Sequence, residues 1–176
     1  MRRQITAVLG TALGVGLALA PSIAPAAPRA SGTETFSGVL VASGGSGERS
    51  VVSSVIVAEG VFTGSGRIVE VPNRPGDPDS VSRDDLVFPG GKMHIVSTSK
   101  APTVSLDPQT CALTIRIQQR AKVDGGTGRF RHAAGKFVSS VRGRGVASRN
   151  PDGSCAAEGA LLVEVDIVAA RGTLSL

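Results

Sequence analysis

Apolar and polar residues alternate along most of the chain after residue 30. The clearest example is the segment 161–167, LLVEVDI, in which four aliphatic residues share one face of an extended chain while Glu164 and Asp166 point to the other. The segment 114–117, TIRI, alternates in the same way and places Arg116 outward if its isoleucines lie in the core. A period of two, with many Val, Ile, Thr and Ser residues, predicts strands rather than helices.

Seven segments have this composition, and clusters of Gly, Pro, Asn or Asp separate them. They are 33–42, 51–58, 61–71, 92–99, 112–123, 135–148 and 159–174. Without crossover helices, so many strands hide their edges by closing into a barrel or by stacking as a sandwich. Glycines inside strand patterns, as in VFTGSG at 61–66 and RGRG at 142–145, relieve strong bending. We therefore expect an all-β fold, a closed antiparallel barrel of about eight strands, with a β-sandwich as the alternative.

The segment 72–91, PNRPGDPDSVSRDDLVFPGG, is the one long stretch that we expect to be irregular. Loops of this length often serve as binding lids, although a packed surface connection explains the composition equally well. Within it, Ser82, Arg83, Asp84 and Asp85 are expected to form a turn or cap, in which the carboxylates accept backbone N–H bonds and Arg83 pairs nearby.

The first 26 residues resemble a secretory signal peptide. Arg2 and Arg3 form a basic start, 5–20 is an uncharged apolar run that is short for a membrane span, and Ala24-Pro25-Ala26 is a small-x-small cleavage site. We expect Sec-type export to an extracytoplasmic or secreted location, with a twin-arginine signal or an N-terminal membrane anchor as alternatives. After cleavage no stable membrane insertion is expected.

Removal of this segment takes away Arg2 and Arg3 but no acidic residue, which lowers the formal net charge from +5 to +3. The expected mature chain has a flexible start at 27–32 and a single barrel domain at 33–176, long enough to bury one core. Cys111 and Cys155 are the only cysteines, and in an exported chain they predict a disulfide.

The segment 125–135, GGTGRFRHAAG, has glycine spacings that invite comparison with phosphate-binding loops. It lacks the Gly-Lys-Ser/Thr of a Walker loop, and Arg131 stands where a dinucleotide fingerprint needs its third glycine. The pattern instead predicts a tight turn with positive φ at glycine, after which Phe130 packs on the core and fixes the start of the next strand.

This hairpin resembles the GGTGxFxxAxG hairpin of the allene oxide cyclase and dirigent barrel superfamily over about residues 115–146. The segments 71–88 and 150–155 are also similar to small exported actinobacterial proteins. The resemblance implies an eight-stranded antiparallel barrel with an apolar cavity, often assembled as a trimer, and a structural role for the hairpin. Its motif residues are Gly125, Gly126, Thr127, Gly128, Phe130 and Gly135.

The chain departs from these families in its aromatic residues, since it has five Phe and no Trp or Tyr. The polar and aromatic cavity residues of plant cyclases and dirigent proteins therefore have no recognisable counterpart, and no activity is carried over. We expect an exported barrel that binds a small hydrophobic ligand or serves as a rigid interaction module. The alternative is a cyclase-like or dirigent-like enzyme that guides a reactive hydrophobic intermediate in the cavity.

Candidate catalytic residues are few. His94 could act as a general base if a carboxylate met it inside a cavity, whereas a partly exposed strand histidine is the plainer interpretation. The carboxylates considered are Asp84, Asp85, Glu70 and Glu164. Two histidines without ligand spacing predict no metal site, and no cofactor is expected.

Basic residues also cluster in the hairpin. If the paired residue numbers sum to about 258, Arg116 lies opposite Arg142, Thr114 opposite Arg144, and Lys122 opposite Lys136. Like charges that face one another need solvent or a bridging anion. A solvated outer face is favoured over a patch for acidic polymers, and no nucleic-acid partner is expected because stacking aromatic residues are scarce.

Overall fold

The computed structural model describes residues 30–44, 49–156 and 161–176, and nearly all of them lie in strands. The strands are β1 Ser31–Gly44, β2 Arg49–Glu59, β3 Gly64–Val71, β4 Val81–Phe88, β5 Gly91–Ser99, β6 Thr103–Leu106, β7 Ala112–Gly126, β8 Ala134–Ala147 and β9 Leu161–Ser175, with a 3₁₀ turn, η1, at Gly128–Phe130. Strand β1 thus begins inside the segment 27–32 that was expected to precede the barrel. The expected signal peptide, 1–26, lies outside the described residues.

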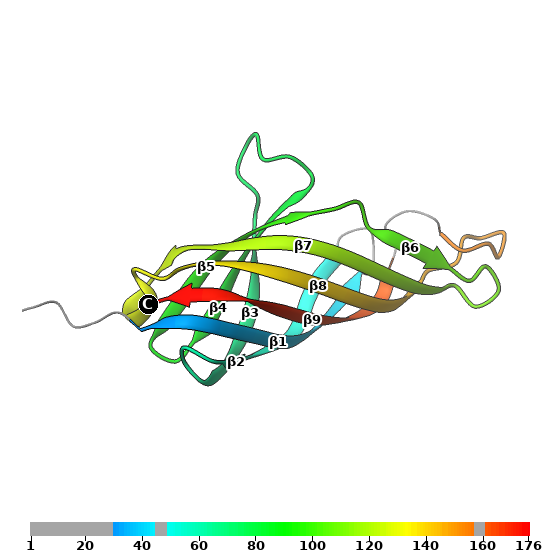
Figure 1. Cartoon of the computed structure of the whole chain (residues 1–176). Helices are drawn as coiled ribbons and strands as arrows, with labels where there is room; N and C mark the ends of the chain where they lie inside the picture. The colour runs from blue at the N-terminus through cyan, green and yellow to red at the C-terminus, as the bar shows by residue number, and fades with distance from the viewer. Residues whose placement is uncertain (1–29, 45–48, 157–160) are drawn as a thin grey trace, which may run out of the picture.

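The strands form one antiparallel sheet in the order β5-β4-β3-β2-β1-β9-β8-β7-β6. Pairing of β5 with the second half of β7 closes the sheet into an eight-stranded barrel. The short strand β6 pairs with the first half of β7. Figure 1 shows η1 and the C terminus at one end of the barrel and β6 near the other. The expected closed barrel is confirmed. A sandwich is excluded because its two sheets would be separate, whereas these strands form one sheet that closes on itself.

Two strands, β4 and the short β6, lie outside the segments that the sequence pattern predicted, and only β4 belongs to the closed barrel. The expected irregular stretch 72–91 contains β4, so the prediction of a turn or cap at Ser82–Asp85 was wrong. The two adjacent aspartates obscured the alternation, because Asp84 points into the barrel, where strands usually place apolar residues. Arg83 points outward and pairs with Asp77, with 2.7 Å between Arg83 Nε and Asp77 Oδ2. Only the part before β4 forms the projecting loop in Figure 1.

All five phenylalanines gather at one end of the barrel. Phe36 comes from β1, Phe62 from the β2–β3 turn, Phe88 from the end of β4, Phe130 from η1 and Phe137 from β8. Their ring centroids lie 5.1 to 6.4 Å apart in six contacting pairs. We call this cluster the phenylalanine plug. Such aromatic packing buries a large apolar area and closes this end of the barrel.

The glycine-rich hairpin turn supports the plug as the sequence predicted. Gly125 and Gly128 have φ values of 80° and 58°, and Phe130 is fully buried. A Cβ atom at Gly128 would lie 2.0 Å from the Gly90 carbonyl oxygen, so only glycine fits this close approach. The assumed β7–β8 register is also confirmed, with Arg116 opposite Arg142 and both exposed on the outer face.

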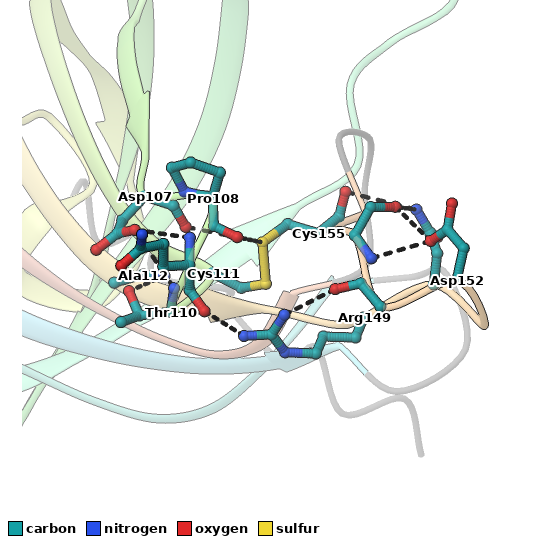
Figure 2. The surroundings of a disulfide bond; sticks show 12 residues. Asp107, Pro108, Thr110, Cys111, Ala112, Arg149, Asp152 and Cys155 are labelled. Atoms are coloured by element: carbon teal, nitrogen blue, oxygen red, sulfur yellow. Dashed lines mark hydrogen bonds between the residues drawn. A yellow bond between two sulfur atoms is a disulfide. The ribbon is translucent and has the colours of Figure 1, made fainter.

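The disulfide between Cys111 and Cys155 lies at the other end of the barrel, before β7 begins and after β8 ends. Figure 2 shows its surroundings. The bond joins the turn before β7 to the connection between β8 and β9, and the Cα atoms are 5.4 Å apart. Asp107 shapes the turn by accepting an N–H bond from Gln109 at 2.8 Å, while Arg149 Nη1 donates to the Gly153 carbonyl at 2.7 Å. The expected disulfide is therefore present and fastens the connections around this end of the barrel.

Replacement of both cysteines by serine should lower the free energy of unfolding by up to about 4 kcal/mol, because the bond closes a loop of 44 residues in the unfolded chain. The barrel should still form, since the strand ladder does not depend on this bond. Urea unfolding followed by far-UV circular dichroism measures both effects. Unchanged stability, or two thiols that react in the unreduced wild type, would contradict the assignment.

Candidate functional site

The barrel encloses a cavity of about 450 Å³ between the phenylalanine plug and the end that carries the disulfide. This volume is within the range of small-molecule sites in proteins. The lining is mainly aliphatic and aromatic and comes from all eight barrel strands. Its apolar members are Phe36, Leu40, Ile56, Ile68, Leu86, Ile95, Ile115, Ile117, Ala121, Phe137, Val141, Leu161, Val168 and Ala170.

Charged side chains gather at the end of the cavity away from the plug. Arg49 is the first residue of β2 and is surrounded by carboxylates from β3 and β9. Its Nε donates to Glu164 Oε2 at 2.7 Å, its Nη2 donates to Asp166 Oδ2 at 3.0 Å, and its Nη1 donates to Glu70. One guanidinium therefore holds three carboxylates, and Asp84 lines the same cavity as a fourth. We call these five residues the acidic mouth.

Strand β9 supplies two of the acids because its polar side chains, rather than its aliphatic ones, point into the barrel. Glu164 and Asp166 are buried and face the cavity, whereas Val165 and Ile167 face outward, with Ile167 57% exposed. The neighbouring strand makes room for them at Gly143. A Cβ atom there would lie 2.5 Å from Asp166 Oδ1 and 3.1 Å from Glu164 Oε1. This glycine therefore provides space for carboxylates in addition to any bend in the strand.

The acids on the opposite wall face one another directly. Glu70 of β3 pairs in register with Asp84 of β4, and both side chains line the cavity. Glu70 is bonded to Arg49, whereas the Asp84 carboxyl receives no hydrogen bond from the residues that the structure describes. Burial, followed by the charge of Glu70, raises the pKa of Asp84 from its ordinary 3.8 to about 6.

The same balance governs the wall formed by β9. Burial, followed by the charge of Glu164, raises the pKa of Asp166 to about 6, although Arg49 opposes the shift. Burial also disfavours the charge of Arg49 itself, but its hydrogen bonds to Glu164 and Glu70 outweigh this effect and raise the pKa of the guanidinium. The acidic mouth thus has more carboxyl groups than its one cation can neutralise, and two of them titrate near pH 6.

A weaker polar band crosses the cavity wall between the mouth and the plug. This band consists of three residues that line the cavity, namely Ser97, Gln119 and Ser139. Gln119 Nε2 donates to Ser99 Oγ at 3.1 Å. These neutral groups offer hydrogen bonds without charge. A molecule in the cavity would therefore meet an apolar end, a few neutral polar groups and an acidic mouth in succession.

The structure separates the residues that the sequence suggested as a catalytic set. Glu70 and Glu164 both line the cavity, but His94 lies on the outer face of β5, with its side chain 42% exposed. There His94 Nδ1 lies 2.6 Å from Asp85 Oδ1, and Lys92 Nζ donates to the same carboxyl at 2.5 Å. Burial opposes ionisation of Asp85, but these two bonds outweigh it and lower its pKa. His94 therefore meets a carboxylate outside the cavity.

Two residues of the acidic mouth were not proposed as site residues from the sequence. Asp166 had a signal, since two acids at alternate positions of an apolar strand place both on one face. Arg49 had none, because it follows a glycine-rich stretch and its three partners are distant in sequence. Only the closed barrel brings them together.

No family model matches the chain, and neither a curated protein nor a solved structure matches it. The resemblance to the cyclase and dirigent superfamily, and the trimer that it implies, therefore stay predictions. No helix within residues 30–44, 49–156 and 161–176 is long and apolar enough to cross a membrane. In the same ranges, no three His, Cys, Asp or Glu side chains are grouped to hold a metal ion.

The raised pKa of Asp84 predicts a pH-dependent loss of stability. A carboxyl with a raised folded-state pKa stabilises fully below its unfolded pKa and loses this contribution as pH rises through 6. Wild type should therefore lose about 2 kcal/mol relative to Asp84→Asn between pH 4.5 and 7.5. Urea unfolding across this range measures the difference.

Asp77→Asn provides the control, because Arg83 and the backbone of Arg74 lower the pKa of Asp77 to about 2. Its difference from wild type should stay constant between pH 4.5 and 7.5. An equally constant difference for Asp84→Asn would show that the folded barrel does not disfavour this carboxylate.

Proposed function

We propose that the protein binds a small hydrophobic ligand inside the barrel. The observation that carries this proposal is the cavity of about 450 Å³, which lies within a closed barrel and has mainly apolar walls. Apolar lining with a few polar groups at fixed positions is typical of small-molecule sites. The phenylalanine plug closes one end, so the ligand enters from the acidic mouth.

We also propose that the barrel works outside the cytoplasm. The disulfide between Cys111 and Cys155 supports an oxidising compartment, where such bonds persist. The basic and apolar pattern of residues 1–26 supports export through a cleaved signal peptide. A rigid barrel fastened by a disulfide near the cavity entrance suits a binder exposed to that environment.

A bulky residue inside the cavity should weaken binding, whereas the same residue on the outer face should not. Ala170 lines the cavity and Ala169 is exposed on the outer face of the same strand. We expect Ala170→Phe to weaken binding of the neutral fluorophore N-phenyl-1-naphthylamine at least tenfold, and Ala169→Phe to bind it as wild type does. Fluorescence titration gives the dissociation constants.

Circular dichroism identifies variants that fail to fold, and Ala121→Phe is a second cavity-filling variant on another strand. A wild type that shows no saturable binding would overturn the proposal. Equal binding by wild type and both folded cavity-filling variants would also overturn it, because the probe would then sit outside the barrel.

A second function is favoured by one specific observation, the half-buried Asp84 carboxyl with a pKa of about 6 inside the cavity. Such a group can donate or accept a proton near neutral pH. The corresponding function is an enzyme that guides a reactive hydrophobic intermediate by confinement, with Asp84 transferring the proton.

This function predicts a change of product stereochemistry when an uncharged epoxide, such as that of a fatty-acid methyl ester, or a phenoxy radical reacts in the presence of the protein. Asp84→Asn should remove the effect on the epoxide, while Ala169→Phe should keep it. Chiral chromatography of the products measures the outcome. Identical product ratios with and without wild-type protein would exclude the enzyme for these substrates and leave ligand binding unaffected.

A further inference from the structure

The acidic mouth and the apolar chamber together restrict the ligand more closely than hydrophobicity does. Four carboxyl groups meet one guanidinium, and the arginine already contacts three of them. Asp84 is left without a hydrogen-bond donor among the described residues, although its carboxyl borders the cavity. In a partly dehydrated site such an excess of negative charge is costly unless a proton or a cation offsets it.

Protonation provides one solution, and the raised pKa values of Asp84 and Asp166 indicate that these two carboxyls take up protons below about pH 6. A cationic group of a ligand would provide another. An ammonium group has three N–H donors and a compact charge, so it can satisfy several carboxylate oxygens at once. Glu70 and Asp84, which are paired across β3 and β4, present such oxygens to the cavity.

An anionic ligand fits this arrangement poorly. A fatty-acid carboxylate at the mouth would face Glu70, Asp84 and Asp166, while the guanidinium of Arg49 is already engaged by its own three partners. Toward the plug, the described residues that line the cavity are apolar or neutral, such as Ser139 and Gln119. The charged group of any ligand must therefore lie at the mouth, where positive charge is favoured.

We propose that the cavity selects hydrophobic amines, with the ammonium head at Glu70 and Asp84 and the apolar body extending toward Phe36 and Phe137. This inference rests on the proposed ligand-binding function and narrows it to one chemical class. Recognition combines two physical terms: burial of the apolar body and charge-assisted hydrogen bonds to the head. Neutral analogues retain only the first term, and acidic analogues oppose the second.

Three probes with the same alkyl chain test the selectivity, namely decylamine, decanol and decanoate, each below its micelle concentration at pH 7.5. Each is titrated against N-phenyl-1-naphthylamine bound to the full mature protein. We expect decylamine to displace the fluorophore at a concentration at least tenfold lower than decanol, and decanoate to be weaker than decanol. Asp84→Asn should reduce the advantage of the amine over decanol about tenfold.

Asp79→Asn is the matched control, because it removes one carboxylate from an exposed position in the loop before β4. It should behave as wild type with all three probes. Ala170→Phe should weaken all three, which assigns them to the same cavity.

A second measurement follows the protons. An ammonium head beside Asp84 lowers the pKa of this carboxyl, so decylamine binding at pH 6 should release protons, and Asp84→Asn should reduce the release. Isothermal titration calorimetry in buffers of different ionisation enthalpy measures the number. Decanol should release none.

The outcomes distinguish this inference from the function on which it rests. If no probe binds wild type, the ligand-binding function and the inference both fail. If decanol binds as well as decylamine, or if decanoate binds best, the inference is overturned and the ligand-binding function stands. If decylamine still binds more tightly than decanol by the same factor in Asp84→Asn, the placement of the ammonium group at Asp84 is overturned.

Discussion

The interaction on which the site depends is the contact of one guanidinium with three carboxylates inside a β-barrel. Arg49 lies on β2, and its partners Glu70, Glu164 and Asp166 come from β3 and β9, so the contact spans several strands at the cavity entrance. Glu164 and Asp166 are buried, so loss of Arg49 would leave their charges uncompensated and would be costly. The cluster keeps charged groups within an otherwise apolar lining and thereby gives the cavity a polar end.

The two ends of the barrel differ in packing and charge. At one end the phenylalanine plug and the glycine-rich turn fill the interior, and the turn needs glycine because Gly128 approaches the Gly90 carbonyl closely. At the other end charged side chains leave space between them, and the disulfide fastens the connecting segments outside. The packed end contributes to stability, whereas the other end contains the charged groups of the cavity.

Much of the architecture could be predicted from the sequence because alternation and turn residues are local signals. They indicated seven of the barrel strands, and the register assumed for β7 and β8 agrees with the structure. The disulfide was indicated separately, by two cysteines in a chain that was expected to be exported. Strand β4 escaped because Asp84 occupies an inward position, and a polar interior contradicts the rule that strands bury apolar residues. Asp84 also belongs to the acidic mouth, and departures from local sequence rules are expected at functional positions.

The site itself could be predicted only in fragments. Glu164 and Asp166 share a face in any strand, but nothing local says that this face is the interior, and Val165 and Ile167 made the opposite choice more plausible. Arg49 joins acids that are 21, 115 and 117 residues away, so its partners depend on closure of the whole barrel. His94 does meet a carboxylate, that of Asp85, but the pair lies on the outer surface and not in the cavity.

A crystal structure of the protein with decylamine tests the central claim most directly. The account predicts that the alkyl chain lies inside the barrel toward Phe36 and Phe137 and that the ammonium nitrogen is within hydrogen-bond distance of Asp84 or Glu70. It also predicts that Arg49 keeps its contacts with Glu164 and Asp166. An amine on the outer face, or an interior filled by rearranged side chains with no room for the chain, would contradict it.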